Sequence, residues 1–225
     1  MRLFSILIFL FISGNLISQD NSLELDRVYG LNPHLYNGKK YTYFLPYGTG
    51  GNQFLESSYF TLGEITIKGK KFDGIAINYD VFNQQLLLEY TNETGTSDII
   101  EVSKAWLESF RLGGKDFQLL DLGNGERFYQ ILGEGPVFIL FFFRKDLTLE
   151  HTSRGSNYTF TPPFRSQFVL IGGTLNAFRK KRSLISIFDP GKEQEIKKYI
   201  KDRKLDLKKA SDHDMTELIN FINNL

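Results

Sequence analysis

Three histidines, His34, His151 and His213, are the residues of this chain best suited to acid–base chemistry or metal binding near neutral pH. None of them has a second histidine two or four positions away, so the spacing does not supply the paired ligands of a histidine metal site. The chain contains no cysteine, which excludes thiolate ligands and a cysteine nucleophile. The sequence therefore predicts no metal site and no cofactor.

Two short segments place a histidine beside other catalytic residue types. Residues 212–214 are Asp-His-Asp, and residues 151–156 contain His151, Ser153 and Ser156. Acidic residues are common in the first turn of a helix, where they oppose the helix dipole, so we interpret 212–214 as an exposed helix start. We interpret 151–156 as a polar loop. Because no nucleophile-elbow or Ser-x-x-Lys motif is present, the sequence predicts no catalytic residues, and a hydrolase with an unrecognised site remains an alternative.

The strongest polar feature is a basic block in the last quarter of the chain. Residues 179–209 hold 12 Lys and Arg against 5 Asp and Glu, whereas the whole chain has a net charge of +1. Such a block is either the solvated face of an amphipathic helix or a patch for an anionic partner. The candidate patch consists of Arg179, Lys180, Lys181, Arg182, Lys197, Lys198, Lys201 and Lys204. Its candidate partners are an envelope protein or an acidic lipid surface, and we expect no nucleic acid because the chain carries an export signal.

That export signal lies at the N-terminus. Arg2 precedes an apolar run over residues 3–12, and small and polar residues follow. This order is typical of a secretory signal peptide, and the run is shorter than the roughly 20 residues needed to span a bilayer. We expect a signal peptide over residues 1–18, with cleavage after Ser18, and a mature protein that is exported and periplasmic or associated with the cell envelope. The amphipathic C-terminus argues against a transmembrane barrel, whose last strand should close it.

Short apolar and aromatic runs separated by Gly, Asn and Asp dominate the chain up to Phe178. This pattern predicts an antiparallel β domain over residues 19–178, a meander sheet that forms a partly open barrel, with a sandwich as the alternative. The glycines at 38, 69, 114 and 173 are expected at hairpin turns, because such turns need positive φ. The run over residues 137–143 is apolar at every position, which predicts a central strand covered on both faces.

One hairpin contains a conflict of register. A two-residue turn at Lys68-Gly69 places Ile65 on the same face as Phe72, whereas the alternation continues at Ile75. Because side chains alternate along a strand, either the loop has an odd number of residues or a bulge lies near Gly74.

The hydrophobic period changes from strand-like to helix-like after Phe178. A segment over residues 179–225 is expected to be helical, basic and packed on the sheet. Asp189-Pro190 is typical of a helix start, and Ser211 with Asp214 is expected to form a capping box. Two apolar stripes should face the sheet, because isolated helices of this length are marginal in water. The stripes are Ile196, Tyr199 and Ile200, and Met215, Leu218, Ile219 and Ile222.

In the order of its turn glycine, its strand aromatic residues and its basic tail, the chain resembles a group of exported bacterial proteins. The residues that carry the resemblance are Gly63, Ile65, Ile67, Gly69 and Phe72, followed by Asn78-Tyr79-Asp80, and the ending over residues 180–209 and 218–225. The group consists of uncharacterised, β-rich envelope proteins with a helical C-terminal tail. No activity is assigned to them, so the resemblance implies a fold and no functional residues.

These observations favour a non-enzymatic binding or assembly module of the periplasm or envelope. An alternative is a carrier that encloses a lipid or another apolar ligand in the cavity of a curved sheet. The aromatic content of 15% suits such a cavity, and it suits a packed core equally well.

Overall fold

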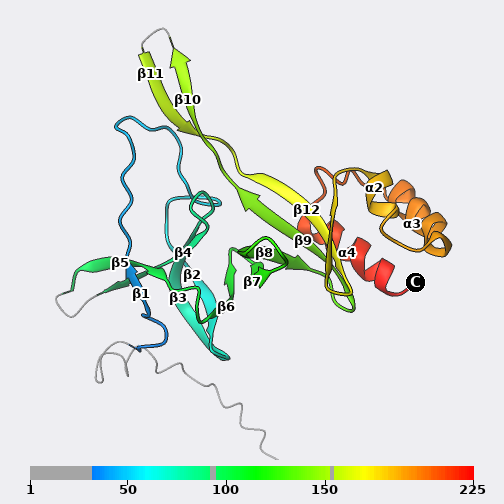
Figure 1. The fold of residues 1–225 in the computed structure, drawn as a ribbon, viewed down its shortest axis with the longest axis horizontal. Coiled ribbons are helices and arrows are strands. Elements are labelled where there is room, and N and C mark those ends of the chain that lie inside the picture. Colours follow the sequence, from blue (N-terminus) through cyan, green and yellow to red (C-terminus); the bar gives the residue numbers. More distant parts are fainter. Residues whose placement is uncertain (1–31, 92–94, 153–154) are drawn as a thin grey trace, which may run out of the picture. The chain divides into compact units, whose positions relative to one another are not determined.

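The computed structural model describes residues 32–91, 95–152 and 155–225, and residues 33–225 form one compact unit (Figure 1). The expected signal peptide and its cleavage site lie outside the described residues.

An antiparallel sheet of eleven strands forms most of this unit. Its strands lie in the order β1-β5-β4-β3-β2-β6-β7-β8-β9-β12-β13, and β1 and β13 each pair on one side only. The predicted antiparallel meander is therefore confirmed, and the sheet is not closed. The strands are β1 (Gly38–Lys40), β2 (Thr61–Ile67), β3 (Lys70–Asp80), β4 (Gln85–Thr91), β5 (Ser97–Val102), β6 (Leu107–Leu112), β7 (Lys115–Asp121), β8 (Glu126–Leu132), β9 (Val137–Arg144), β12 (Phe164–Ile171) and β13 (Thr174–Phe178).

The register conflict between β2 and β3 is resolved by a bulge. Ile65 pairs with Phe72 across a two-residue turn at Lys68-Gly69, whose φ angles of 50° and 70° are those of a tight hairpin turn. The register shifts between Gly63 and Glu64, and Gly74 is the extra residue, with φ 70°. Gly114 and Gly173 also have the expected positive φ at turns. Gly38 differs, because it lies in β1, where a side chain would collide with the backbone of β5.

One row of side chains shows where the core lies. Directly paired residues run from Ile65 on β2 to Phe178 on β13, and paired residues share a face of the sheet. Between them lie Phe110, Phe117, Gln130, Phe141 and Gln167. Aromatic rings fill much of this face, and the ring of Tyr79 packs edge-on against Phe110, Phe117 and Phe128 at 5.4–5.5 Å.

The opposite face of β9 is apolar but only partly covered. Val137, Ile139, Phe141 and Phe143 belong to the main core. On the other face Leu140 is buried beside Ile131 and Phe168, whereas Phe138 and Phe142 remain half-buried. The prediction of full cover on both faces was therefore too strong, because side chains of the neighbouring strands, and not a second layer, shield this face.

Three helices follow the last strand: α2 (Lys181–Ile185), α3 (Pro190–Asp202) and α4 (Asp212–Asn223). Ser211 caps α4, and Asp214 completes the predicted capping box. All seven predicted stripe residues contribute to the core: six are buried, and the half-buried Tyr199 stacks on Phe221 with ring centroids 4.3 Å apart. The helices pack on the same face as the row of core residues, as α4 contacts β8 and β9 (Figure 1).

The end of α4 is fixed to the turn between β8 and β9 by two asparagines. The amide of Asn223 donates to the carbonyls of Glu134 at 2.6 Å and Val137 at 2.9 Å, and its oxygen accepts from Val137 N at 3.1 Å. Asn220 Oδ1 accepts from Glu134 N at 3.0 Å. These contacts give hydrogen-bond partners to backbone groups at the turn between β8 and β9.

Replacing Asn223 with alanine should therefore destabilise the protein by about 1–3 kcal/mol, because three hydrogen bonds to the turn are lost. The matched control is Asn224→Ala, at the exposed neighbouring position, which should change stability by less than about 0.5 kcal/mol. Urea unfolding measures both. Equal stability of the two variants would contradict this role for Asn223.

A second, two-stranded sheet continues from β9 and β12. It consists of β10 (Leu147–Thr152) and β11 (Gly155–Phe160), paired as a hairpin (Figure 1). Residues 162 and 163, between β11 and β12, are both proline. Because proline cannot donate a hydrogen bond to a ladder, the ladder between β9 and β12 is not continuous with the ladder between β10 and β11. Gly50, from the segment before β2, forms a bridge with Thr159 of β11.

Candidate functional site

Five of the eight predicted basic residues meet in a groove between α2 and α3. The groove has a volume of about 990 Å³, and the buried side chain of Ile185 lies among its lining residues. Its basic residues are Lys181, Arg182, Lys197, Lys198 and Lys201, and its acidic residues are Glu193 and Asp202. We call it the basic groove. Residues that are about fifteen positions apart in the sequence thus face one concave surface because α2 packs against α3.

Two lysines of the basic groove already have partners within the protein. Lys181 Nζ donates to the carbonyl of Lys197 at 2.9 Å, which links α2 to α3. Lys197 Nζ forms an ion pair with Glu193 at 3.0 Å, one turn earlier on α3. By contrast Arg182, Lys198 and Lys201 are exposed, and among the described residues none of them forms an ion pair. These three cations are free to meet an external anion.

The remaining members of the predicted patch lie at or near the same place. Arg179 and Lys180 line a smaller groove of about 560 Å³, which shares Arg182 and Ser186 with the basic groove. Lys204 lies just after α3 with φ 52° and lines neither groove. The structure therefore brings seven of the eight predicted residues together and leaves Lys204 outside.

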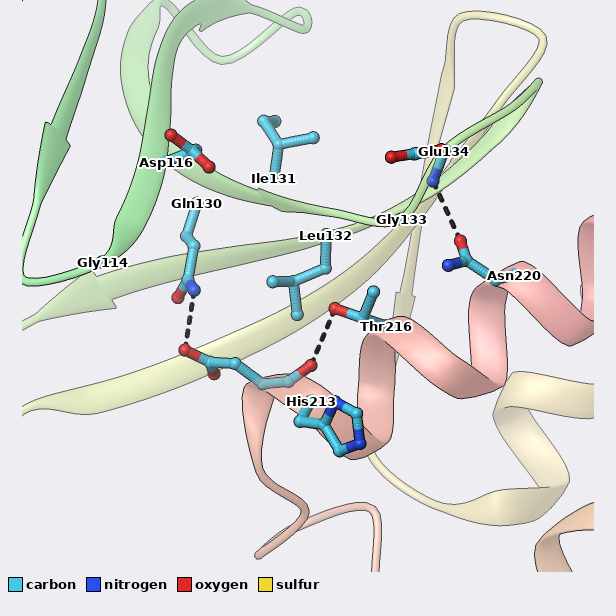
Figure 2. A pocket seen from close by; sticks show the side chains of 11 residues that line it. Gly114, Asp116, Gln130, Ile131, Leu132, Gly133, Glu134, His213, Thr216 and Asn220 are labelled. Atoms are coloured by element: carbon cyan, nitrogen blue, oxygen red, sulfur yellow. Dashed lines mark hydrogen bonds between the residues drawn. The ribbon is translucent and has the colours of Figure 1, made fainter.

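A second pocket, of about 320 Å³, lies where the start of α4 meets β8 (Figure 2). Gln130 Nε2 donates to Asp212 Oδ2 at 2.8 Å, and the Thr216 hydroxyl donates to the Asp212 carbonyl at 2.8 Å. Lys115 and Arg165 lie 3.7 and 3.8 Å from the Asp212 carboxylate. The buried Gln130 Oε1 has no hydrogen-bond partner among the described residues, so this oxygen can accept a hydrogen bond from a water or another small donor.

This second pocket has polar groups but no reactive pair. The carboxylate of Asp212 accepts a hydrogen bond from Gln130 and forms longer ion pairs with Lys115 and Arg165. The carboxylate of Asp116 accepts two hydrogen bonds from Arg111, at 2.6 and 2.9 Å. His213 is exposed at the pocket rim, as its place in a first helical turn predicts. The polar contacts in this pocket therefore orient α4 on the sheet, and no group in its lining is placed to activate a nucleophile.

The three histidines lie on separate elements. His34 packs near Trp106, with ring centroids 5.9 Å apart, and His151 lies on β10. His151 Nδ1 is 2.7 Å from Ser156 Oγ, a contact typical of a catalytic base and its nucleophile. Both side chains are exposed on the hairpin, and no carboxylate that orients His151 is found among the described residues. In the described ranges no group of histidine, aspartate and glutamate side chains could hold a metal ion.

A buried cluster around Asp80 was not predicted. Asp80, at the end of β3, accepts hydrogen bonds from the Tyr41 hydroxyl at 2.9 Å and from the Asn83 side chain at 2.8 Å. It also accepts from the backbone N–H groups of Phe82 and Asn83, at 3.1 and 2.8 Å. Burial raises the pKa of Asp80 above its ordinary value, although these donors oppose the shift.

The same cluster contains a buried lysine. Lys145 Nζ donates to the Asn52 carbonyl at 2.9 Å, and burial lowers the pKa of Lys145 while the charge of Asp80 opposes that shift. These groups tie residues 41–53 to β3 and β9. Two sequence signals could have located the cluster. One is the segment of fifteen residues, 41–55, that contains no charged residue, and the other is the Asp-x-x-Asn turn at residues 80–83.

Comparisons with known proteins give no identification, because no family model, curated protein or solved structure matches this chain. Among the described residues no helix has the length and apolar character needed to cross a membrane.

Proposed function

We propose that this protein is an exported, non-enzymatic binding module of the cell envelope whose basic groove holds an acidic segment of a partner protein. The observation that carries the proposal is the convergence of five basic side chains on one groove of about 990 Å³. The three unpaired cations, Arg182, Lys198 and Lys201, supply the electrostatic attraction, and Ile185 with the lysine stems supplies apolar contact.

The shape of the groove favours a protein segment over an acidic lipid surface. A flat layer of head groups reaches the rim of a concave site, whereas a peptide can enter it between α2 and α3. Glu193 and Asp202 in the lining add specificity, because they repel acidic side chains at those two positions. An acidic lipid surface is the competing partner, and binding to vesicles of acidic lipid distinguishes it from an acidic protein segment.

Neither alternative function has a comparable observation in its favour. The aromatic face that a carrier would need for an apolar ligand is filled by its own rings, since Phe110 and Phe117 stack at 4.7 Å under Tyr79. A hydrolase would need an enclosed site around His151 and Ser156, and both lie exposed on the β10–β11 hairpin.

The variant Lys198→Glu with Lys201→Glu should bind a fluorescent deca-glutamate peptide at least tenfold more weakly than the parent protein. Each reversal replaces an attraction by a repulsion, and a tenfold change corresponds to about 1.4 kcal/mol. Lys197 is left intact because its pair with Glu193 belongs to the structure. The matched control is Lys208→Glu with Lys209→Glu, which makes the same change in net charge at exposed positions outside both grooves.

Fluorescence anisotropy at 50 and 500 mM salt provides the measurement, since added salt should weaken binding at an exposed basic site. Equal loss of binding in the groove variant and in the control would show that only net charge matters, which would contradict the proposal. Binding to vesicles of acidic lipid that exceeds peptide binding and depends on Lys198 and Lys201 would show that the partner is lipid.

A further inference from the structure

Two segments of the protein contain no Asp, Glu, Lys or Arg, although 24% of the whole chain is charged. They are residues 41–55 and 155–164, and charged side chains border them, as Glu150 of β10 pairs with Asn157 and Arg144 lies over the ring of Phe164. The two segments lie side by side, because Gly50 N donates to the Tyr158 carbonyl at 2.8 Å and Phe160 N donates to the Gly50 carbonyl at 3.0 Å. We call them together the uncharged surface.

Large apolar side chains project from the uncharged surface into solvent. Phe44 is 91% exposed and Tyr47 is 104% exposed, values at which a ring makes almost no contact within the protein. Leu45 and Tyr158 are also exposed, and so is Leu149 of the neighbouring strand β10, which pairs with Tyr158. Single exposed apolar residues are ordinary, whereas a group of them on one uncharged surface indicates a contact site.

The backbone that presents these rings is held in place. A turn is closed by Thr49 N donating to the Pro46 carbonyl at 3.2 Å, and Gly48 has the positive φ of 75° that such a turn needs after Tyr47. The Thr49 hydroxyl donates to the same carbonyl at 2.6 Å. The base of the segment is an aromatic series, in which Tyr41 stacks on Tyr43, Tyr43 contacts Phe82, and Phe82 contacts Phe160.

The absence of charge distinguishes among partners. Protein interfaces keep a polar, partly charged rim and are enriched in arginine, so a protein partner gives no reason to exclude charges over 25 residues (15 in residues 41–55 and 10 in residues 155–164). A lipid bilayer gives that reason, because each charged side chain carried into its apolar layer is unfavourable. Tyr, Phe and Leu are the residues that favour the boundary between head groups and acyl chains.

We propose that the uncharged surface binds the interface of a zwitterionic lipid bilayer, with Phe44 and Tyr47 inserted at the level of the head groups. The backbone suits this depth, because the carbonyl of Pro46 and both polar groups of Gly50 are already paired. The hydroxyl of Tyr47 can remain in contact with water while its ring lies at the boundary between the head groups and the acyl chains. This inference does not rest on the basic groove and needs no acidic lipid.

The test is flotation of the folded protein with vesicles of pure phosphatidylcholine. We expect the parent protein to float with the vesicles at 50 and at 500 mM salt, since no charge pairing is involved. The variant Phe44→Trp should shift its fluorescence to shorter wavelength on binding and should be quenched by brominated lipid. Trp106, the only tryptophan of the parent chain, lies in the turn between β5 and β6, where its carbonyl accepts from Lys68 N, and should not be quenched.

The variant Phe44→Ser with Tyr47→Ser should lose at least tenfold in vesicle partitioning and keep its melting temperature, because both rings are exposed. The matched control is Tyr59→Ser, a ring that is 79% exposed outside the uncharged surface, and it should bind as the parent does. Absence of flotation, or an equal loss in the control, would overturn the proposal. So would binding that requires acidic lipid and is abolished by Lys198→Glu with Lys201→Glu.

Discussion

Replacing Asp80 with alanine should destabilise the protein by about 3–5 kcal/mol, one of the two largest effects expected for a single substitution here. The change leaves three donors, the Tyr41 hydroxyl, the Asn83 amide and the Asn83 N–H group, without the carboxylate that accepts from them. The N–H group of Phe82 loses its bond to Asp80 at 3.1 Å and keeps only a longer one, at 3.3 Å, to the Gln53 carbonyl. Each buried donor left unpaired costs about 1–3 kcal/mol, reduced by local relaxation. It also leaves Lys145 buried without its nearby carboxylate.

Urea unfolding of the variant beside Asp73→Ala measures this effect. Asp73 lies on the same strand but is exposed, and its pair with Lys71 at 3.4 Å is a surface pair, so its loss should cost less than about 1 kcal/mol. A cost for Asp80→Ala as small as that of Asp73→Ala would show that the cluster does not hold residues 41–53 in place.

The pH dependence of stability offers a separate check on Asp80. Because the pKa of Asp80 is raised in the folded protein, the folded state binds its proton more tightly than the unfolded state does. The stabilisation from this proton is present below the ordinary pKa of 3.8 and is lost as the pH rises through the folded-state pKa. In Asp80→Asn this fall in stability with rising pH should be missing, so the difference in stability between parent and variant should change with pH. A difference between the two proteins that does not change with pH would contradict the raised pKa.

Replacing Gly133 with valine should destabilise the protein by about 3–5 kcal/mol for two independent reasons. Gly133 has φ 94°, a conformation that is strained for a β-branched residue. A side chain there would also collide with Ile219 of α4, so the helix would have to move away from the β8–β9 turn. The same displacement would stretch the hydrogen bond between Asn220 and Glu134.

Gly123→Val separates these two contributions. Gly123 has a similar φ of 89°, but a side chain at this position would meet nothing within 4 Å. Its variant should therefore lose only the backbone part, about 1–2 kcal/mol. If Gly133→Val costs no more than Gly123→Val, α4 does not pack tightly on this turn. Thermal unfolding of the two variants side by side decides the point.

Local patterns were sufficient for many of the elements and turns, although residues 151–156, interpreted as a polar loop, include the end of β10 and the start of β11. The bulge at Gly74 was predictable because the apolar residues of two strands had to lie on the same face of the sheet across a two-residue turn. The capping box of Ser211 and Asp214 was predictable because its two residues are only three positions apart. The pairing of β2 with β6 was not predictable in the same way, since the two strands are separated by three others in the sequence. No local pattern specifies which later strand pairs with the free edge of β2.

The same distinction between local patterns and long-range contacts applies to the sites. The basic residues of α3 were predictable from the polar face of an amphipathic helix, but the basic groove exists only because α2 packs against it. The Asp80 cluster joins residues 41, 80 and 145, and the uncharged surface joins residues 50 and 159. Contacts of this range depend on the whole sheet, so composition marked residues 41–55 as unusual without indicating what they contact.

A single flotation experiment tests whether the basic groove and the uncharged surface make this protein an adaptor between a bilayer and an acidic protein segment. Phosphatidylcholine vesicles, the protein and fluorescent deca-glutamate are mixed and separated on a density gradient. We expect the peptide to float only with the parent protein. With Phe44→Ser and Tyr47→Ser, peptide and protein should stay together at the bottom, and with Lys198→Glu and Lys201→Glu the protein should float without the peptide. Peptide left at the bottom while the folded parent protein floats would contradict the account.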